Sequence, residues 1–235
     1  MRNLLVLWLA FSGSQLLASD LECELSAEVV GAHYARSVAD TDGTQANTST
    51  LTLWRYQRRV AHQYAEAGRT DAWARVADKQ IQLTRFFDAD QRGIEYEAEL
   101  VADGLEDAVW QIRSQLVTAD QIAQLDLIDT TGTGCAVVET YAGRWGDNEV
   151  QLEWLPNRDL VERYSVSSTS RVIEVVLQST TDSVDAVVAQ FSLRDSYKLT
   201  DNADIGDNET DPFLLRMINL GFAESHSSAR DTHTH

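Results

Sequence analysis

Short runs of strand-forming residues, separated by turn-forming residues at regular intervals, constrain the fold of this chain more than any other feature. The runs are five to eight residues long and rich in Trp, Tyr, Phe, Val and Thr, which favour strands. Asp, Gly, Ala and Ser occupy the breaks between them, and this spacing is typical of an antiparallel meander. The predicted strands cover residues 50–56, 59–64, 72–76, 80–87, 93–100, 150–154, 159–166, 172–177 and 187–194.

Two segments follow a helical period instead. Between residues 105 and 127, apolar residues recur at steps of three and four, and Thr118 can cap a second short helix there. Near the end of the chain, Asp211 fits a helix cap, Pro212 fits the first helical position and Gly221 fits the turn that follows a helix. The sequence therefore predicts a central helical insert and a C-terminal helix.

The predicted fold class is mainly β with a few helices. We expect a curved antiparallel sheet or an incomplete β-barrel, covered by the central helical insert and the C-terminal helix. Residues 20–222 are expected to form a single β-rich domain, because a chain of this length can bury one sizeable core. The last residues, 223–235, are mainly Ser, His, Thr and Asp, and this composition predicts a disordered tail.

The first nineteen residues have the pattern of a secretory signal peptide. Arg2 precedes a short apolar stretch, and small residues follow before the first acid, Asp20. The apolar stretch is too short and too interrupted to span a bilayer as a stable helix. We therefore expect residues 1–19 to be cleaved and the protein to be periplasmic or secreted.

The charge balance narrows the range of partners. The formal net charge is −18 at pH 7, with 37 acidic and 19 basic side chains. Such a balance repels nucleic acid and anionic lipid headgroups, so neither is an expected partner, and no membrane span is expected after signal removal. The charge attracts cations or basic partners, although acidity also serves simply to keep an exported protein soluble.

Two cysteines, Cys23 and Cys135, remain after the predicted cleavage. In an oxidising compartment, two cysteines most simply form one disulfide. Attachment of a lipid at Cys23 is disfavoured because Glu22 stands where a lipoprotein signal has a small residue. A nucleophilic role for Cys135, which follows Gly134, is disfavoured because no motif supplies a partner histidine.

An acidic segment near the C-terminus is the candidate metal site. Asp201, Asp204, Asp207 and Glu209 surround Gly206, and Ca²⁺ prefers oxygen ligands from such loops. The spacing does not match an EF-hand, because apolar residues stand at two ligand positions. The alternative interpretation is a solvated turn that leads to the cap of the last helix.

Large aromatic residues give the candidate ligand-binding site. Several tryptophans lie in or beside the predicted strands and the helical insert, and aromatic side chains on a concave sheet can line an apolar cavity. The alternative is that they fill an ordinary core. The candidates are Trp54, Trp73, Trp110 and Trp154. We identify no catalytic residue, because the chain has no Gly-x-Ser-x-Gly, no His-Glu-x-x-His and no phosphate loop.

The order of strands, helical insert, strands and closing helix, together with the signal peptide, resembles the LolA-like periplasmic lipoprotein carriers. That fold is an incomplete antiparallel barrel plugged by helices. Members typically have a proline between the Leu-Trp strand and the following arginine, and this chain has none. The matching segments are Leu53-Trp54-Arg55, Arg59-Val60, Trp73 and Phe86-Phe87-Asp88.

The resemblance implies an exported, non-enzymatic binding or carrier protein that holds an apolar or lipid-like ligand between its sheet and its helices. The alternative is an accessory or scaffold protein of the envelope that binds another protein through a sheet face. A hydrolase using the carboxylates of residues 201–211, or a calcium-binding protein, ranks below both. No cofactor is expected apart from the calcium considered above.

Overall fold

The computed structural model describes residues 27–42, 46–207 and 210–222, and within them thirteen strands form one sheet. The strands are β1 (Val29–Asp40), β2 (Ala46–Tyr56), β3 (Arg59–Tyr64), β4 (Arg69–Ala77), β5 (Gln80–Phe87), β6 (Arg92–Glu95), β7 (Glu99–Leu100), β8 (Leu125–Thr131), β9 (Val138–Trp145), β10 (Asn148–Leu155), β11 (Leu160–Ser167), β12 (Arg171–Thr181) and β13 (Lys198–Asp201).

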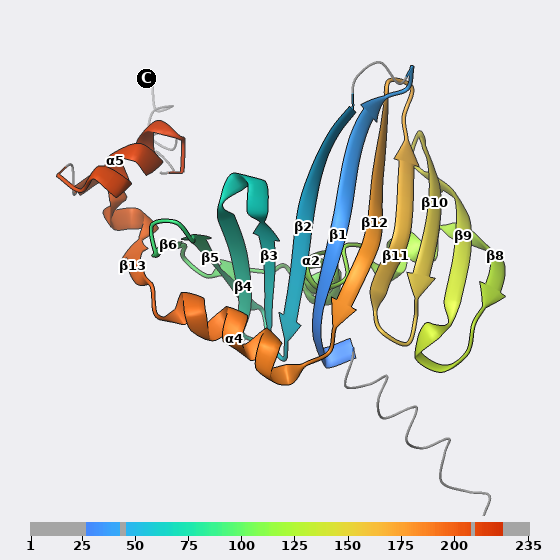
Figure 1. Cartoon of the computed structure of the whole chain (residues 1–235), viewed down its shortest axis with the longest axis horizontal. Helices are drawn as coiled ribbons and strands as arrows, with labels where there is room; N and C mark the ends of the chain where they lie inside the picture. Colours follow the sequence, from blue (N-terminus) through green and yellow to red (C-terminus); the bar gives the residue numbers. More distant parts are fainter. Residues whose placement is uncertain (1–26, 43–45, 208–209, 223–235) are drawn as a thin grey trace, which may run out of the picture.

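The sheet is strongly curved and does not close into a barrel (Figure 1). Its strand order is β13-β6-β5-β4-β3-β2-β1-β12-β11-β10-β9-β8, and β7 pairs with β5 beside this path. Neighbouring strands are antiparallel, except that β13 runs parallel to β6. The two outermost strands, β8 and β13, are far apart in this order, so the sheet has two open ends.

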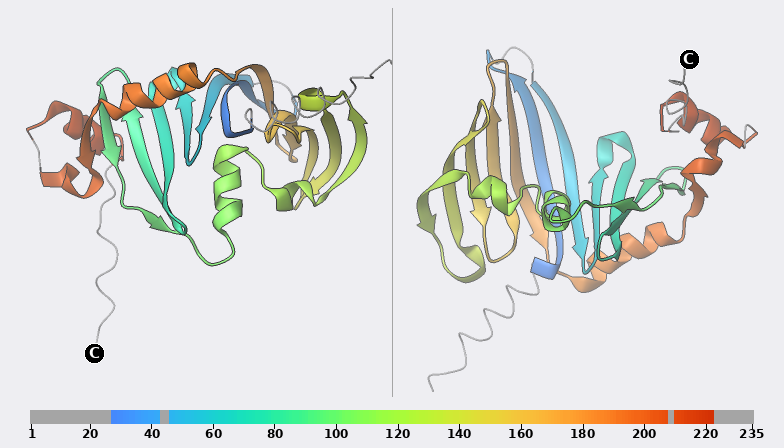
Figure 2. Two further views of the ribbon diagram at one scale, coloured as in Figure 1. Left: turned by 90° about the horizontal axis from the view of Figure 1, so that it is seen from below. Right: turned by 180° about the vertical axis from the view of Figure 1, so that it is seen from behind.

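The described helices are α2 (Glu106–Ser114), α3 (Ala119–Ile122), α4 (Val184–Asp195) and α5 (Pro212–Asn219). Short 3₁₀ turns occur at η1 (Ala65–Ala67), η2 (Gly134–Ala136) and η3 (Asn202–Asp207). Figure 2 shows α2 and α3 on the concave side of the sheet and α4 across its convex side. The sheet therefore has helices on both faces, each covering only part of it.

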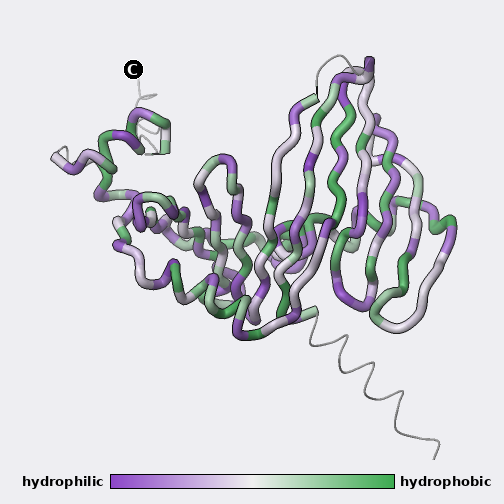
Figure 3. The backbone as a smooth tube through the Cα atoms, viewed as in Figure 1, coloured by the Kyte–Doolittle hydropathy of each residue, from purple (hydrophilic) through white to green (hydrophobic). Residues whose placement is uncertain are grey.

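The largest apolar cluster lies between the concave face and the α2–α3 segment. Strand residues that point inward pack together with Val117 and Leu125, which flank α3, and with the partly buried Trp110 of α2. Figure 3 shows apolar and polar residues alternating along parts of the central strands, and every second residue there points into this cluster. The strand residues of this cluster that are fully buried, at 0% exposure, are Val30, Ala32, Leu53, Val60, Leu160 and Val161.

Two smaller clusters attach the C-terminal helices. On the convex face, Val187 and Phe191 of α4 pack against Trp54 and Phe86. At the β5–β6 end of the sheet, α5 packs against Phe87 and Ile94. Phe213, Leu214 and Met217 are the residues of α5 that are buried there.

The predicted fold class is confirmed: the protein is mainly β, with a curved, unclosed antiparallel sheet and few helices. The predicted caps are confirmed as well. The Thr118 side chain accepts a hydrogen bond from the backbone N–H of Gln121, and the Gln121 side-chain oxygen accepts one from the backbone N–H of Thr118, which makes a capping box. Asp211 caps α5 through the backbone N–H of Phe213, and Pro212 is its first residue.

Three local predictions are wrong. The run 93–100, expected as one strand, divides into β6 and β7, and residues 96–98 belong to neither. Residues 187–194, interpreted above as a strand, belong to helix α4, whose N-cap Ser183 accepts a hydrogen bond from the backbone N–H of Ala186. The buried residues are Val187, Phe191 and Arg194. Their steps of four and three residues fit one face of a helix and not the alternation of a strand. The helical insert also ends before residue 125, where the unpredicted strand β8 begins.

Of the predicted segments, residues 1–19 and 223–235 lie outside the described part of the chain. Within the described residues, no helix has the length and apolar character needed to cross a membrane.

Candidate functional site

The concave face is filled over one part of the sheet and open over another. Helices α2 and α3 cover the centre and the β8 side, whereas α5 covers the β5–β6 end (Figure 2). Between the two, over β4 and β5, lies a groove of about 920 Å³. It is larger than three other pockets, of about 270, 510 and 380 Å³, and is the candidate ligand-binding site.

The floor of the groove is apolar. Trp73 of β4 and Leu83 of β5 are paired in the sheet register, and both side chains are partly exposed on the open face. Ile81 lies two residues before Leu83 on the same side of β5 and is buried at the groove. These three side chains provide a surface on which an apolar group can lie.

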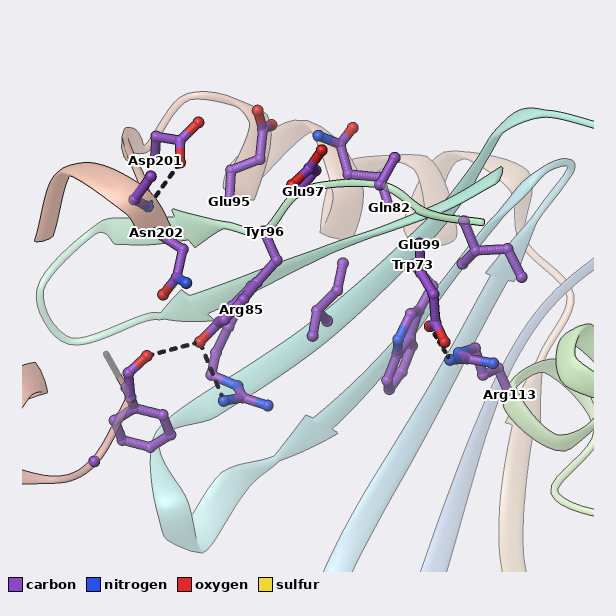
Figure 4. Close-up of a pocket in the computed structure, with 16 residues that line it drawn as sticks. Trp73, Gln82, Arg85, Glu95, Tyr96, Glu97, Glu99, Arg113, Asp201 and Asn202 are labelled. Carbon is purple, nitrogen blue, oxygen red and sulfur yellow. Dashed lines mark hydrogen bonds and ion pairs between the residues drawn. The ribbon is translucent and has the colours of Figure 1, made fainter. Parts of the chain in front are cut away.

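The wall on the α5 side is formed around Arg85. Its Nε atom donates to Asp71 at 2.7 Å, and its Nη1 atom donates to the Tyr96 hydroxyl at 3.3 Å. Its guanidinium carbon lies 5.1 Å from the ring centre of Phe222, the last described residue. The Tyr96 hydroxyl in turn donates to the Phe222 carbonyl oxygen at 3.3 Å (Figure 4). This network fixes the end of the described chain against the sheet.

The wall on the α2 side is formed by Arg113. Its guanidinium lies 5.5 Å from the ring centre of Trp73, and its Nη2 atom is 3.7 Å from a carboxylate oxygen of Glu99. Burial lowers the pKa of Arg113, because removal from water disfavours the charged form. In Figure 4, Trp73 lies between Arg85 and Arg113, and Glu95 and Glu97 lie on the rim. The groove therefore combines an apolar floor with charged walls.

Helix α2 is fixed in place through the carbonyl groups at its C-terminal end. Arg55 of β2 is buried, and its Nη1 atom donates to the carbonyl oxygen of Ser114 at 2.8 Å. The same guanidinium donates to the carbonyl oxygens of Asp159 at 3.0 Å and Arg158 at 2.7 Å, in the turn between β10 and β11. Burial lowers the pKa of Arg55 to about 10. Cationic side chains at a helix C-terminus are favoured by the helix dipole.

A second clamp on α2 comes from β3. The Nε2 atom of His62 lies 2.6 Å from the carbonyl oxygen of Arg113, and a carbonyl only accepts, so this nitrogen carries a proton and donates. Burial lowers the pKa of His62 to about 4, which keeps the ring neutral near pH 7. The edge of the imidazole also packs against Trp73, at 4.9 Å between ring centres. His62 thus links the end of α2 to the floor of the groove.

The four predicted ligand-binding tryptophans do not lie together. Trp73 lines the groove. Trp54 points to the opposite face, in the cluster beneath α4, where its Nε1 donates to Gln63 at 3.1 Å. Trp154 is buried in the filled part of the concave core, and Trp110 lies on α2 with Arg75 stacked 4.6 Å from its ring centre. Among the four, Trp73 is the one that the structure places at the groove.

The acidic segment lies partly beside the groove. Asp201, at the end of β13, lines it, and its carboxylate accepts a hydrogen bond from the backbone N–H of Ala203 at 2.8 Å. Asp204 is exposed in η3; Glu209 lies outside the described residues, and so does the side chain of Asp207. Among the described residues, no three His, Cys, Asp or Glu side chains are grouped to hold a metal ion. The calcium site therefore remains a prediction.

The Cys23–Cys135 disulfide likewise remains a prediction, because Cys23 lies outside the described residues. Sequence reasoning did not identify Arg113, Tyr96 and Phe222 as groove residues. They come from three segments that are distant in sequence, and no periodicity connects them. Arg85 lies opposite Asp71 in the β4–β5 register and forms an ion pair with it at 2.7 Å.

No family model and no curated protein matches the chain. Similar solved structures do exist. PNGF-II matches 74% of this chain at 10% identity and a TM-score of 0.39, and this chain spans only 31% of the length of that one. The Mycobacterium tuberculosis lipoprotein LppX matches 73% of this chain and 98% of its own, at 10% identity and a TM-score of 0.31.

A putative outer membrane lipoprotein-sorting protein domain from Vibrio parahaemolyticus matches 76% of this chain and 97% of its own, at 6% identity and a TM-score of 0.29. A lipoprotein-sorting domain is thus among the similar structures. Because these TM-scores are all below 0.5, the proposed function rests on the geometry of this chain's own residues.

Proposed function

We propose that this protein is an exported, non-enzymatic binding protein of the carrier type, which holds an apolar or lipid-like ligand in the groove over β4 and β5. The observation that carries the proposal is the groove itself: about 920 Å³ of space on the concave sheet face, between the parts covered by α2 and by α5. A partly exposed apolar floor in a groove between two docked helices is the kind of concave surface on which small-molecule ligands bind.

The groove suits a ligand with an apolar body and a polar end. The body lies on Trp73 and Leu83, where aromatic and aliphatic surface is partly exposed. The polar end lies toward the charged walls, where Arg113 has one exposed carboxylate partner at 3.7 Å. The predicted signal peptide of residues 1–19 supports a periplasmic or secreted location for this function.

The test is binding of a fluorescent fatty-acid analogue to the mature protein, followed by quenching of tryptophan emission. Two conservative variants localise the probe. In Trp73→Phe, the apolar ring remains but the emitter at the groove is lost, so most of the quenching disappears while binding persists. In Trp154→Phe, the emitter removed lies in the filled core, so the quenching is retained. Equal loss of quenching in both variants would contradict a site over β4.

A second pair of variants tests affinity. Leu83→Glu places a charge on the groove floor and is expected to weaken binding by roughly tenfold or more, because an unpaired charge at an apolar contact is costly. Leu193→Glu is the matched control, since this side chain is 49% exposed on α4, on the other face of the sheet. If the folded wild-type protein binds no acyl probe saturably, the carrier proposal fails.

A further inference from the structure

The open end of the sheet at β8 has an exposed edge with unusual chemistry. Among the described residues, β8 pairs with β9 on one side and with no strand on the other (Figure 1). All of its residues except Leu125 are exposed, including two large apolar ones: Leu127 is 54% exposed and Ile128 is 62% exposed. Natural proteins rarely leave an apolar strand edge open, because it invites pairing with another chain.

The edge is protected against indiscriminate pairing. A bulge interrupts the β8–β9 register between Leu127 and Asp129. The carboxylate of Asp129 also accepts a hydrogen bond from the backbone N–H of Thr130 at 2.9 Å. A bulge and charged residues on an edge are devices that discourage nonspecific strand addition. β8 has a second carboxylate at Asp126. A partner strand must therefore supply positive charge to compensate for Asp126 and Asp129.

A groove lies beside this edge on the face of the sheet opposite α2 and α3. It has a volume of about 380 Å³ and is lined by Ile128 together with residues of β9, β10, β11 and β12. Asp126 and Asp129 pair in the register with Ala142 and Thr140, which both line this groove, so the two acids belong to the same face. The surface beside the exposed edge is therefore apolar at Ile128 and acidic on either side of it.

The groove adds further negative charge. Its one lining cation, Arg163, is shared between Glu174 at 3.0 Å and Glu153 at 3.9 Å. β8 itself has two acids and no basic residue. The formal net charge is therefore negative both on β8 and on the residues that line the groove beside it. A second copy of this chain is disfavoured as the occupant, because its own β8 would place like charges opposite Asp126 and Asp129.

We propose that β8 is a docking edge for an extended segment of another protein, in which basic and apolar residues alternate. The added strand pairs its backbone with the outer edge of β8. Its basic side chains lie on the groove face beside Asp126 and Asp129, where one displaces the Asp129 carboxylate from the Thr130 amide. Its apolar side chains cover Leu127. This surface is separate from the groove over β4 and β5 and does not depend on the carrier proposal.

Synthetic peptides test the chemistry. The probe is a short blocked peptide of alternating valine and lysine, measured by isothermal titration. The first control replaces every lysine with glutamate, and the second replaces alternate valines with proline, which removes backbone donors. The lysine peptide is expected to bind saturably and more weakly as salt rises, and both controls are expected to bind at least roughly fivefold more weakly. Equal binding of the lysine and glutamate peptides would overturn the proposal.

Charge reversal tests the location. The double variant Asp126→Lys with Asp129→Lys alters only exposed side chains and is expected to reverse the preference, so that the glutamate peptide binds better. The matched control, Asp103→Lys with Asp107→Lys, makes the same change in net charge at two side chains that are each 89% exposed, near α2. The control is expected to keep the preference for lysine. A reversal in both variants would show a nonspecific charge effect and overturn the proposal.

Hydrogen exchange completes the test, because added strands protect edge amides. Addition of the lysine peptide should slow exchange within residues 125–131. Protection confined to the groove over β4 and β5 would overturn the proposal. So would concentration-dependent self-association that Ile128→Asp abolishes, because the edge would then serve a second copy of the chain.

Discussion

The imidazole of His62 and the backbone carbonyl of Arg113 are joined by a hydrogen bond of 2.6 Å, which ties strand β3 to the end of helix α2 beside the groove. The bond requires only a donor at Nε2, and both the neutral ring with its proton there and the charged ring supply one. Burial, rather than this bond, sets the pKa of His62 to about 4. His62 therefore makes the stability of the fold depend on pH.

The first prediction concerns acid sensitivity. The pKa of His62 is lowered from about 6.5 in the unfolded chain to about 4 in the fold, so the unfolded state takes up the proton first as pH falls. Its contribution to the free energy of unfolding is present above pH 6.5 and falls by roughly 3 kcal/mol as pH drops to about 4. Urea unfolding of wild type and His62→Gln across this range measures it. The variant should lose stability less steeply, and parallel curves would contradict the assignment.

The second prediction concerns the other clamp on α2. In Arg55→Met, three carbonyl oxygens lose a charged donor, and we expect the free energy of unfolding to fall by about 3 kcal/mol or more. Arg55→Lys should recover only part of it, because an ammonium cannot match the planar guanidinium at three sites. Arg58→Ala, at an exposed neighbour, serves as control and should stay within about 0.5 kcal/mol of wild type. If Arg55→Met leaves the free energy of unfolding unchanged, Arg55 does not clamp α2.

The third prediction separates the two faces of α5. Leu214 is 1% exposed against Phe87 and Ile94, whereas the next residue, Leu215, is 41% exposed. Leu214→Ala should lower the free energy of unfolding by about 2–5 kcal/mol, since it leaves a cavity. Leu215→Ala should change it by about 0.5 kcal/mol or less. Thermal unfolding of both variants checks this, and similar melting temperatures would argue against docking of α5.

The fourth prediction concerns the two cysteines. Thiol titration of the denatured, unreduced mature protein should detect no free thiol if Cys23 and Cys135 are bridged. The bridge closes a loop of over a hundred residues, so its reduction should cost roughly 4 kcal/mol in the chain-entropy model. Mass spectrometry distinguishes the alternative, because an acyl group at Cys23 would appear as added mass. Two free thiols in protein purified without a reductant would contradict the bridge.

Local sequence signals predicted much of the fold. Thr118 and Asp211 cap α3 and α5 as their sequences indicate, because a cap depends only on the residues that follow it. In α4, apolar side chains alternate as in a strand, so the sequence pattern there predicts the wrong element; they are Val187, Ala189, Phe191 and Leu193. The segment packs Val187 and Phe191 against the convex face of the sheet and also buries Arg194, and the step of three from Phe191 to Arg194 fits a helix but not a strand. Strand β8 was missed because an exposed, bulged edge has no buried face to impose a period.

The candidate site was predicted less well than the fold. Trp73 was named from its residue type and lies at the groove, but Trp54 and Trp154 share that residue type and are packed elsewhere. A groove is the space left between elements, so it depends on where α2 and α5 stop on the sheet. Arg113 and Phe222 form its opposite walls, and they are more than a hundred positions apart. Residue type and local spacing do not predict that two residues so far apart in the sequence lie on opposite sides of one groove.

The position of β1 in the sheet has a consequence for how the chain reaches its fold. β1 lies between β2, its neighbour in sequence, and β12, with Gly31 opposite Thr181. During synthesis, the β1–β2 hairpin forms early, but its other edge stays uncovered until nearly the whole sheet has been made. Contacts that join such distant segments slow folding. The edge of β1 that pairs with β12 therefore stays uncovered until residues 171–181 have been made.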